Sequence, residues 1–338
     1  MSAPRGWLPL RSKIERTRHK VQRLATAAGL AGVLVLAFAL LPAARTSALA
    51  ALPLANTLLA FDSDRGGNYE IYTMRTDGAN VTRLTTNTAH DSSWPRISPD
   101  RTRILFYRTP KGVHDTDYTK TSLWVMDSDG GNQSLLLAVG AYGWRLQGHA
   151  EWSPDGLSLV MSGGASSNPQ VFVTDARGQN PRQLTNRGGV NIDPAWSPDG
   201  KTIVFIGCPT SVCPTKSYEI YTIPAAGGEA KRLTKNNFRD HDPYYSPNGS
   251  VITWIRQTGG LFRWGIFKMN ADGTGETVII DDGGINSVPR WSLDATKLYF
   301  HRRPVGGTGF NIFSINPDGS GLFELDPLAP GNNEYPAN

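Results

Sequence analysis

Short alternating runs of hydrophobic and polar residues recur along the chain, each bounded by glycine, proline or aspartate. The clearest copy covers residues 194–205 and turns at Ser197-Pro198-Asp199-Gly200. Proline holds φ at about −65°, aspartate can hydrogen-bond its own backbone, and glycine permits the left-handed conformation that reverses the chain. The apolar run that follows is β-branched or aromatic, which suits a half-buried strand. The stretch therefore predicts a strand, a tight turn and a second strand.

The same turn returns at nearly regular intervals. Its serine is found in five copies separated by 55, 44, 49 and 46 residues, namely Ser98, Ser153, Ser197, Ser246 and Ser292. A period in the forties with four strands per unit is typical of a propeller blade.

Each unit continues with a strand of the Tyr-Glu-Ile-Tyr type, a glycine turn that is often Asp-Gly, and a short last strand. Asp-Gly between two alternating runs is a strong hairpin signal. We expect the third strand of the successive units at Tyr69–Met74, Leu123–Met126, Val171–Thr174, Tyr218–Ile223, Gly265–Met269 and Asn311–Ile315. The fourth strand is clearest at Arg83-Leu84-Thr85, Gln183-Leu184-Thr185 and Arg232-Leu233-Thr234.

The two ends of the chain carry incomplete units that complement each other. Residues 58–85 supply strands two, three and four, whereas 333–338 align with the first strand at 191–195. The sequence therefore predicts an all-β fold over residues 57–338. It would be a six-bladed β-propeller of four-stranded blades, closed by the C-terminal strand joining the N-terminal blade. Closure removes open sheet edges. The alternative is an open solenoid or a sandwich.

The repeat resembles a known family. Asp-x-Pro-x-Trp-Ser-Pro-Asp-Gly-Lys, followed by Glu-Ile-Tyr, Asp-Gly and Arg-Leu-Thr, is similar to the TolB-type WD-like β-propeller repeat over residues 57–338. The resemblance implies the propeller fold and, by analogy of fold, a partner in envelope organisation or transport. TolB proteins also carry an α/β domain before the propeller, for which we expect no room here.

Residues 1–50 predict a secretory signal, with 51–56 as a linker. A basic leader precedes the uncharged apolar run 24–41, and Ala48-Leu49-Ala50 offers a cleavage site. An uncleaved membrane anchor is the alternative. Either would place the propeller in the periplasm or outside the cell. The whole chain has a net charge of +5. Because residues 1–50 hold eight basic residues and one acidic residue, the basic excess lies in the leader and no nucleic-acid partner is expected.

The two cysteines, Cys208 and Cys213, are five positions apart in one loop. In an exported protein such a pair predicts a disulfide. A redox or metal site is the alternative, although no histidine lies nearby in the sequence.

Candidate ligand-binding residues gather in the first strand of each unit. The residue before the proline position of the repeat is Trp94, His149, Asp193, Asp242, Val288 or Tyr335, and the residue three before that position is always polar. Because innermost strands line the axis of a propeller, we expect a polar, ligand-facing channel mouth formed by His149, Asp193, Asp242, His241, Arg96 and Arg290. In the alternative, the aspartates only cap turns.

Other recurring residues indicate structure. We expect the aromatic residues that recur at one repeat position to pack between blades, and the turn aspartates to belong to the repeat; these are Trp152, Trp196, Tyr245, Trp291, Asp155 and Asp199. Asp127–Asn132 resembles the start of a calcium loop but coincides with the repeated Asp-Gly turn and lacks the later glutamate. No metal site and no cofactor are predicted.

The sequence contains none of the zinc-hydrolase, nucleophile-elbow or phosphate-loop motifs. We therefore expect an exported, monomeric binding module for an envelope protein or peptide, without catalytic residues and with membrane contact only through an uncleaved N-terminal segment. The alternative is a carbohydrate-active enzyme, a polysaccharide lyase or hydrolase, with its site at the channel mouth. The long insert 108–121 is a second place where recognition can occur.

Overall fold

The apolar runs form short antiparallel strands in the computed structural model, which describes residues 57–208, 217–260, 262–326 and 331–338. These belong to one compact unit, Leu49–Asn338. The leader and linker lie outside the described residues, so the signal stays a prediction. Two 3₁₀ turns, η1 (Tyr118–Lys120) and η2 (Ala141–Gly143), interrupt the strands. No helix in the described ranges is long and apolar enough to span a membrane.

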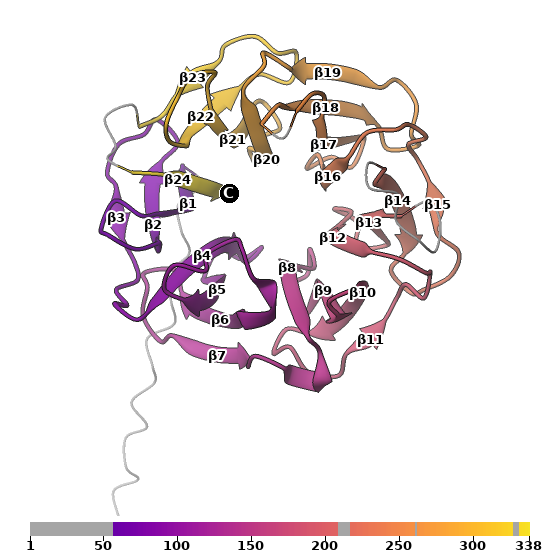
Figure 1. Cartoon of the computed structure of the whole chain (residues 1–338), viewed down its shortest axis with the longest axis horizontal. Helices are drawn as coiled ribbons and strands as arrows, with labels where there is room; N and C mark the ends of the chain where they lie inside the picture. Colours follow the sequence, from indigo (N-terminus) through magenta and orange to yellow (C-terminus); the bar gives the residue numbers. More distant parts are fainter. Residues whose placement is uncertain (1–56, 209–216, 261, 327–330) are drawn as a thin grey trace, which may run out of the picture. The chain divides into compact units, whose positions relative to one another are not determined.

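Four sheets have four strands each and run outward from the centre of the ring in Figure 1. One joins β24 (Asn333–Ala337), β1 (Leu58–Ser63), β2 (Glu70–Arg75) and β3 (Thr82–Arg83). The next contains β4 (His90–Ile97), β5 (Arg103–Pro110), β6 (Ser122–Asp127) and β7 (Ser134–Leu137). The third contains β8 (Leu146–Trp152), β9 (Ser158–Ala165), β10 (Asn168–Asp175) and β11 (Arg182–Gln183). The fourth contains β12 (Asn191–Trp196), β13 (Thr202–Gly207), β14 (Glu219–Pro224) and β15 (Lys231–Arg232).

The other eight strands form one continuous sheet. Its first set is β16 (Asp240–Tyr245), β17 (Val251–Gln257), β18 (Trp264–Asn270) and β19 (Thr277–Ile280). Its second set is β20 (Ile285–Trp291), β21 (Leu298–Arg303), β22 (Asn311–Ile315) and β23 (Phe323–Glu324). The all-β propeller class is confirmed, but the prediction of six separate four-stranded blades is wrong in detail. A parallel pair between Trp264 and Ile285 joins the two sets, because the short link before β20 brings their ends together.

The C-terminal strand closes the ring, as predicted. β24 pairs antiparallel with β1, placing Asn333 opposite Ser63 and Ala337 opposite Ala60. The end of the chain therefore completes the sheet that the N-terminal strands begin, and the innermost strand β24 lies beside β1 in Figure 1.

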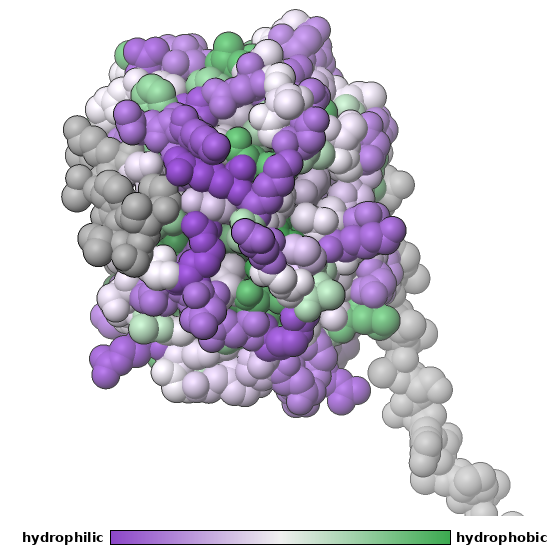
Figure 2. Space-filling view, turned by 90° about the vertical axis from the view of Figure 1, so that its right-hand side faces the viewer, coloured by the Kyte–Doolittle hydropathy of each residue, from purple (hydrophilic) through white to green (hydrophobic). Residues whose placement is uncertain are grey.

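Neighbouring sheets pack face to face through apolar side chains. Phe61 and Tyr72 of the first sheet share a buried cluster with Ile312 of β22. Ile71, from the other face of the same sheet, packs with Phe106 of the second. The first and last sheets are therefore neighbours, as a closed ring requires. The outer side seen in Figure 2 is mostly hydrophilic, with hydrophobic residues scattered over it.

The recurring turn is held by its own side chains. Ser197 Oγ donates to Asp199 Oδ1 at 2.6 Å and accepts from the Thr202 N–H at 2.9 Å. Gly200 takes the left-handed conformation, with φ of 71°. Asp155 makes the same bond with Ser153 at 2.5 Å. The turn aspartates therefore act on their own turns.

Cys208 follows β13 and is buried. Cys213 lies outside the described residues, so the disulfide between the two stays a prediction.

Candidate ligand-binding channel

Each innermost strand contains a bulge at the residue before its proline, or before Ala150, which takes the place of the proline in β8. The register of β4, β8, β12, β16, β20 and β24 shifts there. The residue at the bulge has a positive φ of 49° to 57° in all six, namely Trp94, His149, Asp193, Asp242, Val288 and Tyr335. This conformation is costly for residues other than glycine, and most of all for a β-branched one. The six bulge residues therefore share one uncommon backbone conformation, at one level of the channel.

Three of these positions and His241 form a compact cluster. His149 Nε2 lies 3.1 Å from one oxygen of Asp193, and His241 Nδ1 lies 3.0 Å from the other. Burial opposes the charge on Asp193, but the two rings outweigh it and lower its pKa to about 2. Burial and the charge of Asp193 raise the pKa of Asp242. Asp193 is therefore the ionised centre of the cluster.

The cluster could hold a small cation. Ligand atoms of His149, Asp193 and Asp242 all lie within 4.8 Å of one another, and imidazole with carboxylate suits a divalent transition metal. The sequence predicted no metal site. The cavity beside the cluster has a volume of only about 10 Å³, which corresponds to one water-sized sphere.

The next level of the channel, after the proline, is rich in arginine. Nε of Arg96 and Nη2 of Arg290 both donate to Oε1 of Glu151, the second at 3.0 Å. Each of the three residues is at most 8% exposed. Burial and the charge of Arg96 lower the pKa of Arg290, whose guanidinium lies 4.3 Å from the ring centroid of Tyr244. Two cations here share one carboxylate.

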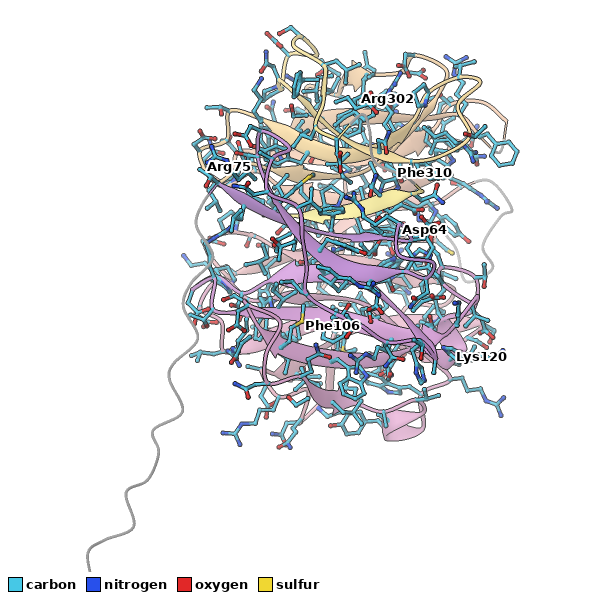
Figure 3. The ribbon with its side chains drawn as sticks, turned by 90° about the vertical axis from the view of Figure 1, so that its left-hand side faces the viewer. Asp64, Arg75, Phe106, Lys120, Arg302 and Phe310 are labelled. Carbon is cyan, nitrogen blue, oxygen red and sulfur yellow. The ribbon has the colours of Figure 1, made fainter. Side chains whose placement is uncertain are left out.

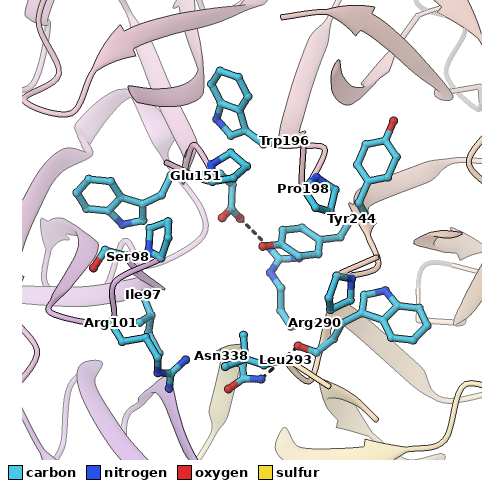
Figure 4. A pocket seen from close by; sticks show the side chains of 16 residues that line it. Ile97, Ser98, Arg101, Glu151, Trp196, Pro198, Tyr244, Arg290, Leu293 and Asn338 are labelled. Carbon is cyan, nitrogen blue, oxygen red and sulfur yellow. Dashed lines mark hydrogen bonds and ion pairs between the residues drawn. The ribbon is translucent and has the colours of Figure 1, made fainter. Parts of the chain in front are cut away.

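Beyond this level the channel widens into a funnel of about 300 Å³. Glu151, Tyr244 and Arg290 line its floor, and the recurring turns form its wall. Figure 4 shows these side chains arranged around the opening, with the ion pair of Glu151 at its centre. The wall residues are Ile97, Ser98, Pro99, Arg101, Trp152, Pro154, Trp196, Pro198, Tyr245, Pro247, Trp291, Leu293 and Asn338.

The long insert contacts the level of the bulges. Tyr118 of η1 packs on Trp94 at 5.4 Å between ring centroids and on His149 at 5.8 Å. His114 stacks on Tyr69 at 3.6 Å. Lys120 lies on the opposite side of the ring from Arg75 in Figure 3. The insert therefore contributes aromatic side chains to one end of the channel, whereas the turns form the other.

Five of the predicted ligand-binding residues line one small cavity: Arg96, His149, Asp193, Asp242 and Arg290. His241 joins them through Asp193. The equivalent bulge residues Trp94, Val288 and Tyr335 are buried, and the Tyr335 hydroxyl donates to Asp115. The geometry brings the predicted residues together, and their role in binding stays a prediction.

The polar residues three before the proline do not line a mouth. Asp240 is fully buried and pairs with Arg256 at 2.7 Å, and Asn191 donates to Gln170 at 3.1 Å. They tie the innermost strand to its neighbours, which corrects the expectation of a polar ring at that position.

The sequence analysis did not select Glu151, Tyr244 or Tyr118 of the insert as candidate ligand-binding residues. Glu151 and Tyr244 follow the proline position of the repeat, as Arg96 and Arg290 do, so the repeat alignment contained the signal. Tyr118 lies in an insert without a repeat equivalent, and only the folded ring brings it to His149.

The recurring aromatic residues pack within the ring. Trp152, Tyr245 and Trp291 are 6–7% exposed, and Trp196 is half-buried. Trp152 Nε1 donates to the Arg96 carbonyl at 3.2 Å, which ties one sheet to the preceding one. Their exposed parts nevertheless contribute to the funnel wall.

Comparison with known proteins identifies the family. The family model described as the TolB beta propeller domain matches residues 144–320, more than half of the chain. The chain belongs to the TolB β-propeller family. A TolB homologue of Chlorobium luteolum is 28% identical over 153 residues, which are 44% of this chain and 31% of that protein. The chain thus spans about a third of the length of this relative.

Solved structures are similar in fold to this TolB-type propeller. TolB of Acinetobacter baumannii superposes with a TM-score of 0.68 at 19% identity, covering 83% of this chain and 66% of that chain. An oligogalacturonate lyase of Vibrio parahaemolyticus gives a TM-score of 0.54 at 13% identity, covering 82% and 77%. At these identities the likeness shows the fold alone.

Proposed function

We propose that this TolB-type propeller is an exported module that binds a protein or peptide partner of the cell envelope. The observation that carries the proposal is the funnel of about 300 Å³, with a mostly apolar wall and a charged floor. A rigid ring holds these groups in place before binding, so little side-chain entropy is lost. The TolB relatives support the general class, since their similarity covers the propeller.

The six-fold arrangement is part of this proposal. The two halves of the eight-stranded sheet repeat the order of the separate sheets and share only the pair of Trp264 with Ile285. We treat each half as one blade, so that six innermost strands surround the channel. Residues 57–338 would then act as one binding domain, monomeric in solution.

Export rests on residues 1–50. Its test is N-terminal sequencing of the protein recovered from fractionated cells. We expect mature chains that begin near residue 51 in the periplasmic or extracellular fraction. Intact chains in the membrane fraction would indicate an anchor instead, and intact chains in the cytoplasm would contradict export.

The carbohydrate-active alternative has weaker support. It would use His149, Asp193 and Asp242, but the cavity beside them has room for about one water. A sugar ring cannot enter such a space without rearrangement of the channel. The likeness to oligogalacturonate lyase concerns the fold, so the geometry favours binding at the funnel.

Two exposed leucines give a matched test of the funnel. Leu293, 48% exposed, lies on its wall, whereas Leu322, 43% exposed, precedes the outer strand β23. Peptides would be selected from a random library on residues 51–338, and their Kd measured by fluorescence anisotropy. We expect Leu293→Ala to weaken binding about threefold to tenfold by removing apolar contact, and Leu322→Ala to leave it unchanged. Equal effects of both changes, or failure to select any peptide, would contradict the proposal.

A further inference from the structure

An excess of positive charge lies at the floor of the funnel, where Arg290 lies, and directly beneath it, where Arg96 lies. Arg96 and Arg290 share Oε1 of Glu151 as their common acceptor. Their other bonds go to neutral carbonyls: Arg96 Nη1 donates to Pro95 at 2.8 Å and Arg290 Nη1 to Pro289 at 3.2 Å. Two buried guanidinium groups are thus balanced locally by one carboxylate. A buried cation is unfavourable unless it is paired.

The acids of the adjoining cluster compensate little of this excess. The carboxylate of Asp193 contacts the two histidines: its oxygens lie 3.1 Å from His149 Nε2 and 3.0 Å from His241 Nδ1. Among the described residues, no ion pair joins Asp242 to Arg96 or to Arg290, whose ion pairs are with Glu151. The charge of the two arginines is therefore only partly compensated, and a second anion beside them would be favourable.

Hydrogen-bond donors at the funnel also lack acceptors. Among the described residues, Nε of Arg290 and Nε1 of both Trp196 and Trp291 are buried without a hydrogen-bond partner. All three residues line the funnel, and Arg290 is 6% exposed. Buried donors are normally satisfied, and an oxygen acceptor that enters beside Arg290 would satisfy its Nε.

The wall fits an extended peptide better than a sugar. One proline from each of four turns lines it, together with Ile97 and Leu293. Sugar binding uses free aromatic faces, but of the four recurring aromatic residues in the wall only Trp196 is half-buried, and Trp152, Tyr245 and Trp291 are at least 93% buried. Apolar side chains of a peptide can pack against such a wall while its backbone stays extended.

We propose that the funnel binds a peptide segment that presents a carboxylate, from aspartate, glutamate or a chain end, to Arg290 beneath a mostly apolar wall. This inference rests on the proposed function and specifies its ligand. The carboxylate would take the donors that Glu151 leaves free, and the residues beside it would contact the prolines.

The test compares peptides selected from the random library with versions in which Asp or Glu is changed to Asn or Gln. Charge-assisted hydrogen bonds are stronger than neutral ones. We therefore expect the neutral versions to bind wild-type protein at least tenfold more weakly, which corresponds to about 1.4 kcal/mol. On Arg290→Gln, both versions should bind alike, because their difference depends on that guanidinium.

A charge change on the exposed wall keeps the test independent of the buried arginine. Leu293→Glu should weaken the acidic peptide, Leu293→Lys should strengthen it, and the matched Leu322→Glu should do neither. Thermal unfolding confirms that each variant is folded. If Arg290→Gln fails to fold, the Leu293 pair decides.

The outcomes distinguish failure of the carboxylate proposal from failure of the proposed function. Peptides that bind at the funnel, as judged by Leu293→Ala, but are indifferent to both charge changes would overturn the carboxylate and leave the proposed function standing. Absence of peptide binding at the funnel would overturn both. Oligogalacturonate that displaces the peptide and binds alone in an Arg290-dependent manner would overturn the assignment to a peptide.

Discussion

A buried threonine follows several of the outer strands and joins them to the strand inside. Thr85, Thr185 and Thr234 accept the N–H of Ile71, Val171 and Ile220, each at 2.9 Å. Thr185 also donates to Gln170 at 2.8 Å. The threonine of the Arg-Leu-Thr motif is therefore a hydrogen-bonding residue, and the outer strands end before it. The sequence showed the motif but not this partner, because the bond crosses the sheet.

Removal of one such hydroxyl should destabilise the ring. We expect Thr185→Val to lower the free energy of unfolding by about 1–3 kcal/mol, because it leaves the Val171 N–H buried and unpaired. Urea unfolding measures the effect. The control is Thr82→Val on the exposed strand β3. If both changes gave the same small loss, the hydroxyl would have no structural role.

A buried histidine should make stability depend on pH. His301 Nδ1 accepts the Tyr335 N–H at 3.1 Å, which requires a neutral ring. Burial, with the charges of His114 and Arg290, lowers its pKa to about 3. The unfolded chain, with a histidine pKa of about 6.5, therefore binds more protons between these values, and stability falls as pH drops from about 6.5 toward 3.

The variant His301→Gln should lose this component of the acid destabilisation. Unfolding free energies measured by urea titration between neutral and acidic pH would compare it with wild type and with His90→Gln, which changes an exposed histidine. A slope in His301→Gln as steep as in wild type would contradict a neutral, buried His301.

Among the elements, β24 has the largest expected effect. Deletion of residues 333–338 leaves β1 as an open edge and removes Ala337 from a buried cluster. We expect the shortened chain to unfold at lower temperature and to aggregate. A synthetic peptide of 331–338 should restore the fold in thermal unfolding and size-exclusion experiments, and a scrambled peptide should not. A shortened chain that stays monomeric and equally stable would contradict closure by β24.

We expect the insert to open locally while the ring stays folded. Asp115 accepts from the hydroxyls of Tyr118 and Tyr335, so it links the insert to β24. We expect Asp115→Ala to speed hydrogen exchange in residues 111–121 while β13 stays protected. Lys111→Ala, an exposed change in the same loop, is the control. Unchanged exchange in Asp115→Ala would show that the link does not hold the insert.

Most elements could be predicted because each is a local pattern. The expected third strands agree with β2, β6, β10, β14, β18 and β22 to within a few residues. The joined sheet could not be predicted, because the pair of Trp264 with Ile285 depends on how a short link folds. The bulges were also missed, since nothing in Val288 or Tyr335 favours a positive φ.

In the whole molecule, the site depends on closure of the ring. Glu151 is 55 residues from Arg96 and 139 from Arg290, yet it accepts from both. The alignment of the repeats gives these residues equivalent positions, although the sequence analysis selected only the two arginines. It could not predict which of them pair, because that follows from the order of the sheets around the axis and from the rotamers of long side chains.

The most direct test of the whole account is a crystal structure of residues 51–338 with a peptide selected from the library. We predict that the peptide lies in the funnel among the Ser-Pro-Asp-Gly turns, with a carboxylate oxygen within hydrogen-bonding distance of Arg290. A peptide bound along an outer strand, or against the insert at the other end of the channel, would contradict it.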